Sequence, residues 1–110
     1  MSNKVLIIIA TGEKEKALTG FFFAINSLKN EWFESVKVVL MGPSENLMAN
    51  NQELQELTSD IFKYESPFAC RFIAENNGLS ENLVGQGYEV EYVGPIIATF
   101  IKAGYLPMVY

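Results

Sequence analysis

The side chain in this chain best suited to chemistry is its single cysteine, Cys70, in the stretch from Pro67 to Gly78. A short apolar run leads into Cys70, and a helix-like segment closing on Gly78 follows it. A thiol in the first turn of a helix meets the positive end of the helix dipole and free backbone N–H groups, which favour the reactive thiolate. Cys70 is therefore the leading nucleophile, and Arg71 beside it would add a favourable charge.

The residue types that are absent limit this chemistry. The chain has no histidine, which excludes Ser-His and Cys-His pairs within one chain. A single cysteine also excludes CxxC redox chemistry and cysteine-rich zinc sites, so we predict neither a metal site nor a cofactor. Another interpretation of Cys70 stays open, because a lone cysteine in apolar surroundings is commonly a small, inert core residue.

Thr11-Gly12 follows the first apolar run and is the second place where a ligand could bind. The GxxxxGK[ST] spacing of a P-loop is absent, so the alternatives are an ordinary turn or an anion site at a helix N-terminus. A flavodoxin relative that binds FMN is a further possibility, although the chain is short for that role. Glu89 and Glu91 share a strand face and are interpreted as solvated charges. A phosphoacceptor receiver domain is not indicated, since no Asp ends the third predicted strand.

Composition limits the class of protein. The 110 residues suffice for one domain, 1–110, and 49% hydrophobic residues exclude a disordered chain. The net charge of −5, with scattered basic residues, argues against a nucleic-acid partner. No apolar run approaches the roughly 20 residues needed for a membrane span. The segment from Met1 to Lys4 lacks the features of a signal peptide, so we expect a cytoplasmic protein with a reduced thiol.

Strands and helices alternate along the chain. Residues 4–10 form an apolar run without polar alternation, which is typical of a central parallel strand. The other predicted strands are 36–41, 68–69 (extending back toward 64), 88–93 and 106–110, the last at an edge because it contains Pro107. The predicted helices are 13–29, 44–62 with an interruption at Asn50-Asn51, 71–78 and 94–104. We expect 80–87 to be a loop with at most one helical turn.

This alternation predicts an α/β fold: a single-domain, doubly wound parallel sheet of about five strands with helices on both faces. We expect the flavodoxin-like strand order 2-1-3-4-5. Ligands of such sheets bind outside the carboxyl ends of the strands, where the order reverses. In that order the first and third strands are neighbours, which would bring Thr11 and Gly12 beside Cys70 and Arg71.

The chain resembles the DsrE/DsrF-like family of small sulfur-relay proteins, which is related to TusD and to YchN-like proteins. The resemblance covers most of the chain and rests on the starting strand 4–10, the strand ending in Phe68-Ala69-Cys70, the helix running to Gly78-Leu79, and the tail 90–105. It implies an α/β sheet, assembly into homo-oligomers (often trimers or hexamers) and, in active members, a cysteine that carries sulfur as a persulfide. Cys70 is the matching position. Many members have basic residues before the helix-closing glycine, where this chain has Glu75-Asn76-Asn77.

The resulting hypothesis is a sulfur carrier or sulfurtransferase-type protein. Cys70 would accept sulfane sulfur from a donor protein and pass it to the thiol of an acceptor protein. The alternative is a non-enzymatic, oligomeric module of the same fold that binds a small ligand or a partner, with Cys70 as a structural residue.

Overall fold

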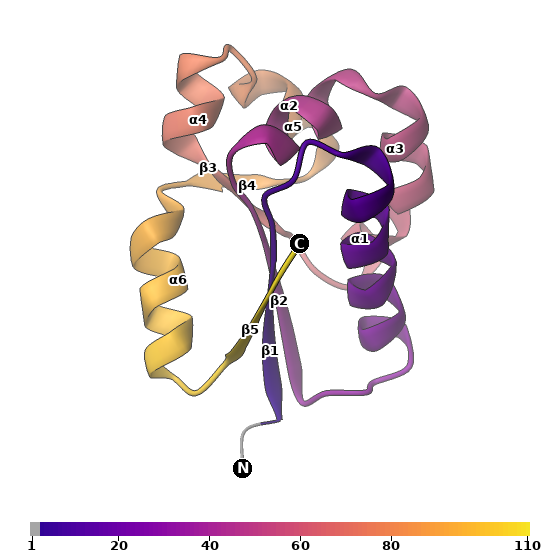
Figure 1. The fold of residues 1–110 in the computed structure, drawn as a ribbon, viewed down its shortest axis with the longest axis vertical. Coiled ribbons are helices and arrows are strands. Elements are labelled where there is room, and N and C mark those ends of the chain that lie inside the picture. The colour runs from indigo at the N-terminus through magenta and orange to yellow at the C-terminus, as the bar shows by residue number, and fades with distance from the viewer. Residues whose placement is uncertain (1–2) are drawn as a thin grey trace.

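The computed structural model describes residues 3–110, which form one five-stranded sheet with helices on both faces (Figure 1). All strand pairings are parallel, which confirms the predicted α/β class. The strands are β1 (Lys4–Ile9), β2 (Ser35–Leu40), β3 (Phe68–Cys70), β4 (Glu89–Glu91) and β5 (Leu106–Val109). The helices are α1 (Lys14–Lys29), α2 (Pro43–Asn50), α3 (Gln52–Thr58), the 3-10 helix η1 (Ser59–Lys63), α4 (Arg71–Asn76), α5 (Ser80–Gln86) and α6 (Val93–Lys102).

The strand order is β4-β3-β2-β1-β5, so the predicted order 2-1-3-4-5 is wrong. β2, and not β3, lies beside β1, and the two pair along their full length from Lys4↔Ser35 to Ile9↔Leu40. The predicted order would have left β2 at an edge of the sheet. Its residues Val36, Val38, Val39 and Leu40 are buried, and a strand this apolar needs neighbours on both sides. β5 pairs with β1 and is the last strand in this order, so it lies at an edge as predicted.

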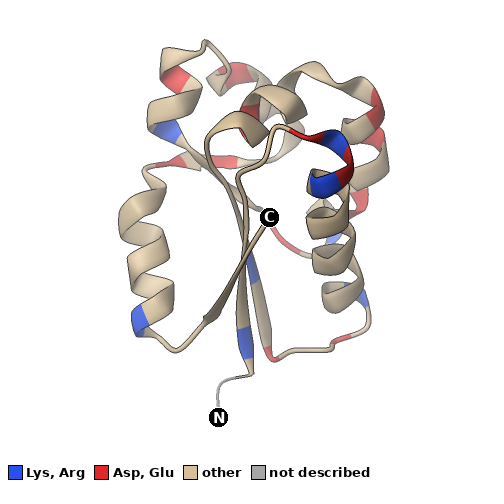
Figure 2. Ribbon diagram, viewed as in Figure 1, with Lys and Arg blue, Asp and Glu red and all other residues tan. Residues whose placement is uncertain are grey.

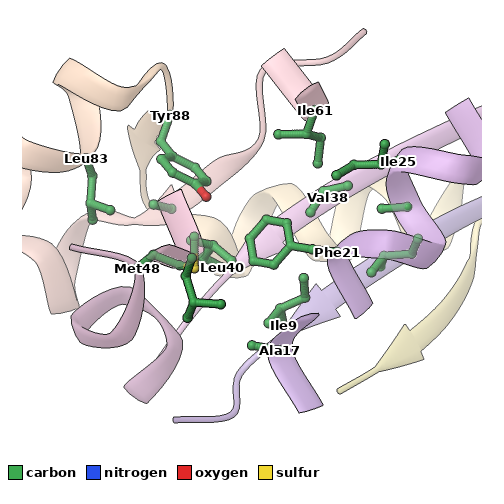
Figure 3. Packing of buried hydrophobic residues seen from close by; sticks show 14 of the residues in the cluster. Ile9, Ala17, Phe21, Ile25, Val38, Leu40, Met48, Ile61, Leu83 and Tyr88 are labelled. Atoms are coloured by element: carbon green, nitrogen blue, oxygen red, sulfur yellow. The ribbon is translucent and has the colours of Figure 1, made fainter. Parts of the chain in front are cut away.

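The sheet separates two apolar clusters. One face packs against α1, α2, α3 and α5, with Ile7, Ile9, Val38 and Leu40 among its core residues (Figure 3). The other face presents Leu6, Ile8 and Val39 to α6. In Figure 1, α6 lies across the sheet from α1, so a single long helix covers this second face. The thinner covering matters for the site, because the side chain of Cys70 belongs to the α6 side.

The three consecutive phenylalanines of α1 point in different directions. Phe21 is fully buried, and its ring lies in the centre of the larger core (Figure 3). Phe22 is exposed, whereas the Phe23 ring packs at 6.0 Å from Trp32 and 6.2 Å from Phe33 between centroids. Phe23 is therefore the phenylalanine that contacts a neighbouring segment of this chain.

The helices begin and end close to the predicted positions, with two differences. Asn51 ends α2 and caps α3 by accepting a hydrogen bond from the Leu54 backbone N–H, which confirms the interruption. The N-cap of α2 is Gly42, so the helix begins at Pro43, one residue before the predicted start at 44. The prediction of a loop at 80–87 is also wrong, because this segment forms α5. Leu83 anchors α5 in the core, and Gly87 closes the helix with a φ of 118°.

None of the helices in residues 3–110 has the length and apolar character that crossing a membrane requires. Figure 2 shows that charge is unevenly distributed over the fold. Acidic residues gather on the helices near the carboxyl ends of the strands, whereas α6 is uncharged until Lys102 in its last turn.

Candidate functional site

Cys70 lies where β3 ends and α4 begins. It is the last residue of the strand and the N-cap of the helix, with extended backbone angles (φ −67°, ψ 117°). Cys70 forms no disulfide, and the residue is half-buried. Its side chain packs at the margin of the apolar cluster beneath α6, which also contains Phe68 and Phe100. Cys70 is therefore a half-buried residue at the edge of this cluster.

Arg71 follows Cys70 and is held at the rim of the site. Its guanidinium forms an ion pair with Glu75 one turn later in α4 and lies 5.3 Å from the centroid of the Tyr92 ring. The hydrogen bond and charge of Glu75 raise the pKa of Arg71 above its ordinary value, so the side chain stays cationic. Tyr92 is 53% exposed, which leaves this cation–π pair open to solvent.

Thr11 and Gly12 contact other parts of the sheet edge. The Thr11 Oγ1 accepts a hydrogen bond from the Glu13 backbone N–H at 3.0 Å, and the Thr11 backbone N–H donates to the Tyr110 carbonyl at 3.2 Å. A Cβ on Gly12 would lie 3.0 Å from the Pro43 Cβ. Because β2 lies between β1 and β3, these two strands are roughly 10 Å apart. The structure therefore brings Cys70 and Arg71 together but does not place Thr11 and Gly12 beside them.

The residue that sequence reasoning missed is Glu45, in the first turn of α2. It is 0% exposed, and neither carboxyl oxygen makes a hydrogen bond of ordinary length and angle. Burial raises the pKa of Glu45 from 4.5 to about 8, while the nearby backbone amides of Cys70 and Gly42 lower it by a smaller amount. At neutral pH this carboxyl is therefore mostly protonated and uncharged.

The start of α2 is tied firmly to the neighbouring strand ends. The Ser44 hydroxyl lies 2.5 Å from the Ile9 carbonyl oxygen and 3.1 Å from that of Met41, and donates toward both. Ser44 is itself fully buried. These contacts fix the start of α2 against the ends of β1 and β2. A Glu three residues after an N-cap commonly caps its own helix at the surface, so nothing in the sequence signals that this one is buried.

Two pockets lie away from Cys70. One of about 430 Å³ opens at the amino-terminal edge of the sheet, where residues 27–28, 31, 33–36 and 65 line it. Another, of about 320 Å³, is lined by Glu75, Gly78, Ser80 and Glu81. In the part of the chain that the structure describes, no three His, Cys, Asp or Glu side chains are grouped so that they could hold a metal ion. The reactive groups at the carboxyl edge are thus a thiol, a guanidinium and a buried carboxyl.

Comparison with known proteins supports the fold alone. No protein-family model matches the chain, and no curated protein matches it by sequence. A solved structure of a conserved protein of unknown function from Bacteroides thetaiotaomicron superimposes with a TM-score of 0.86. The match covers 98% of this chain and 96% of that one, at 23% sequence identity. The same architecture therefore extends over almost all of that chain.

Proposed function

We propose that this protein is a sulfur carrier that holds sulfane sulfur as a persulfide on Cys70. The observation that carries the proposal is the position of Cys70, a free, half-buried cysteine at the carboxyl end of β3. Ligands of parallel α/β sheets bind outside this edge. The resemblance to the sulfur-relay proteins supports the same residue, since Cys70 occupies the matching position at the end of a strand.

The proposed transfer conserves electrons and needs no cofactor. The Cys70 thiolate attacks the terminal sulfur of a donor persulfide, R–S–SH. The S–S bond of the donor breaks, and the donor leaves as the thiolate R–S⁻. Cys70 then carries S–SH, until the thiolate of an acceptor attacks the outer sulfur and releases Cys70 as a thiolate. Such exchange depends on access to the sulfur and on the fraction of thiolate present.

The residues around Cys70 suit a carrier that relies on partner proteins. The chain has no histidine and no second cysteine that could serve as a base or a resolving thiol. The charge of Arg71 lies at the rim beside Cys70 and would attract an anionic persulfide or an acidic partner segment. Donor and acceptor proteins would therefore supply the remaining groups.

The test is the intact mass of the protein after incubation with polysulfide or with a cysteine desulfurase and free cysteine. We expect wild type to gain about 32 Da per sulfur, reversibly with dithiothreitol. Cys70→Ser is the control and should gain nothing. A wild-type protein that stays unmodified in both systems, while iodoacetamide still reaches the thiol, would contradict the proposal.

A second candidate function has one observation in its favour, which is the pocket of about 430 Å³ remote from Cys70. Its lining combines the apolar side chains of Leu28, Phe33 and Val36 with carboxylates and hydroxyls, as in many small-ligand sites. In this alternative the protein binds a ligand and Cys70 is structural. Cys70→Ser would then leave ligand-dependent thermal stabilisation unchanged, whereas Phe33→Ala in the pocket lining would reduce it.

The proposal includes self-association, as the sulfur-relay resemblance implies. Leu106 and Val109 on β5 and Ile101 on α6 are large apolar side chains that this protomer leaves exposed. An edge strand with apolar residues is a surface on which a second copy can pack. Sedimentation velocity would show a species larger than one 12.3 kDa chain. A monomer at all concentrations would contradict this part.

A further inference from the structure

We propose that the pocket at the amino-terminal edge of the sheet is a binding site for an organic cation, namely a short aliphatic diamine. The inference rests on the second candidate function above, for which it names the class of ligand, and it does not depend on sulfur transfer at Cys70. The position of the pocket, its charge, a buried hydroxyl and an apolar wall carry it.

The pocket exists because β3 is shorter than β2. In residues 3–110, β3 pairs with β2 only at Val39 and Leu40, so residues 35–38 of β2 have no strand beside them on that side. The connection from α1 to β2 and the segment before β3 border the space that this leaves, which has a volume of about 430 Å³. A hollow of this size is ample for a small ligand.

The lining of the pocket is acidic. Glu31 and Glu34 come from the connection between α1 and β2, and Glu65 comes from the segment before β3. None of the described residues that line the pocket is Lys or Arg. The Lys37 ammonium lies 3.3 Å from a Glu65 carboxylate oxygen and offsets one of the three negative charges, which leaves the equivalent of two. A dication therefore matches the charge of this pocket.

The arrangement of these carboxylates favours an organic cation over a metal ion. Among residues 3–110, no three His, Cys, Asp or Glu side chains are grouped closely enough to hold a metal ion. Carboxylates that stand apart can instead accept hydrogen bonds from separate ammonium groups. The two ends of a diamine provide such groups.

Ser27 contributes a buried hydroxyl without a partner. A serine or threonine in a helix can donate to the carbonyl one turn earlier, as Thr19 of the same helix does to the Glu15 carbonyl at 3.0 Å. Ser27 lines the pocket and is 0% exposed, yet its hydroxyl has no hydrogen-bond partner among the described residues. Buried polar groups are normally satisfied, so an unpaired hydroxyl in the lining indicates a ligand that supplies the missing N–H.

The rest of the lining is largely apolar. Leu28, Phe33 and Val36 provide a surface for the methylene chain of a diamine. The Phe33 ring, whose centroid lies 6.2 Å from that of Phe23, also offers an aromatic surface to a cation. Carboxylates beside an apolar wall suit an aliphatic chain with charged ends.

The experiment is a titration with 1,4-diaminobutane at constant ionic strength, followed by the fluorescence of Trp32. Trp32 is the single tryptophan of the chain and follows Glu31 in the connection that borders the pocket. We expect saturable binding, about fivefold or more tighter than that of n-butylamine, which carries one charge. 1,4-Butanediol, an uncharged molecule of the same length, should not bind. Absence of saturation with the diamine, or equal binding of the diol, would overturn the proposal.

Substitutions in the lining locate the site. Glu34→Gln should weaken diamine binding about three- to fivefold, whereas Glu15→Gln, in the first turn of α1, is the matched control and should change it by less than about twofold. Glu31→Gly covers the case in which Glu34→Gln fails to fold, since Glu31 has a φ of 53°, which glycine adopts without strain. Glu31→Gly should be at least as heat-stable as wild type and yet bind about three- to fivefold more weakly. Wild-type affinity in both lining variants would contradict the site.

The same titration on Cys70→Ser separates this inference from the sulfur-carrier function, and we expect wild-type affinity. Saturable binding in a protein that never gains sulfur would uphold the cation site and refute the sulfur-carrier function. A protein that gains sulfur but binds no diamine would do the reverse. Thermal stabilisation that is reduced in Phe33→Ala, but that only uncharged or anionic compounds produce, would keep the ligand-binding function and overturn its cationic class.

Discussion

The burial of Glu45 predicts an unusual dependence of stability on pH. The folded protein holds the proton of Glu45 up to about pH 8, whereas an unfolded glutamate releases it near 4.5. Between these values the native state binds one proton more than the unfolded state, so the free energy of unfolding must fall as pH rises. This contribution is complete below pH 4.5 and lost above about 8.

The magnitude follows from the width of that interval. It spans roughly 3.5 pH units, and each unit is worth about 1.4 kcal/mol for one proton. The group therefore accounts for roughly 3 to 5 kcal/mol of stability, a large share of the 5 to 15 kcal/mol that is usual for a whole domain. Glu45→Gln removes the titrating group, so the variant should lack this loss.

The assay is urea unfolding of wild type and of Glu45→Gln, near pH 5 and near pH 8.5. The quantity compared is the difference between their free energies of unfolding at each pH. Taking the difference cancels the contributions of all other carboxylates. We expect the free energy of unfolding of Glu45→Gln, relative to that of wild type, to be roughly 3 to 5 kcal/mol higher near pH 8.5 than near pH 5. Glu81→Gln, at an exposed site, should track wild type. A constant difference between wild type and Glu45→Gln would refute the argument from burial.

Three further substitutions test the core. Tyr88→Phe should raise the free energy of unfolding by about 1 kcal/mol in urea titrations, because the buried Tyr88 hydroxyl has no hydrogen-bond partner among the described residues; destabilisation would reveal a missing partner. Gly87→Ala should cost roughly 2 kcal/mol or more and lower Tm, since φ is 118° and the new Cβ would lie 2.7 Å from the Phe62 ring. An unchanged Tm would contradict this. Phe21→Ala should cost about 3 to 5 kcal/mol by calorimetry, and a loss below 1 kcal/mol would exclude a tightly packed centre.

The fold class was predictable because its signals are local. The continuous apolar run of β1 can be satisfied only by a strand covered on both faces, and the helical stripe of α1 places Phe21 in the core. Gly78, with a φ of 67°, follows the end of α4 as its position in the sequence predicts. Pro107 correctly marked β5 as an edge strand.

The strand order was not predictable from the same signals. Alternation of strands and helices predicts parallel pairing but does not say on which side of β1 each later strand is added. The burial of β2 from Val36 onward was the available clue, because an edge strand would leave part of that apolar surface open. α5 was missed because polar residues surround Leu83 and Val84, and its helical pattern is too short to stand out.

The candidate site was predicted in part. A cysteine directly after an apolar run and before a helical pattern belongs at the carboxyl edge of a parallel sheet, and the structure places Cys70 there. Glu45 was not predictable, because its burial depends on how α2 packs across the ends of two strands. Burial of this kind arises from the tertiary fold and leaves no local pattern in the sequence.

The most direct test of sulfur transfer at Cys70 is a discharge experiment on the loaded protein. Wild type charged with sulfur is split into two samples, one of which receives an acceptor thiol, and both are trapped with iodoacetamide and digested for mass spectrometry. The sulfur-carrier function predicts a trapped persulfide on the Cys70 peptide in the first sample and its stoichiometric appearance on the acceptor in the second. A Cys70 peptide that carries no extra sulfur before discharge, or that keeps it in the presence of the acceptor, would contradict that function.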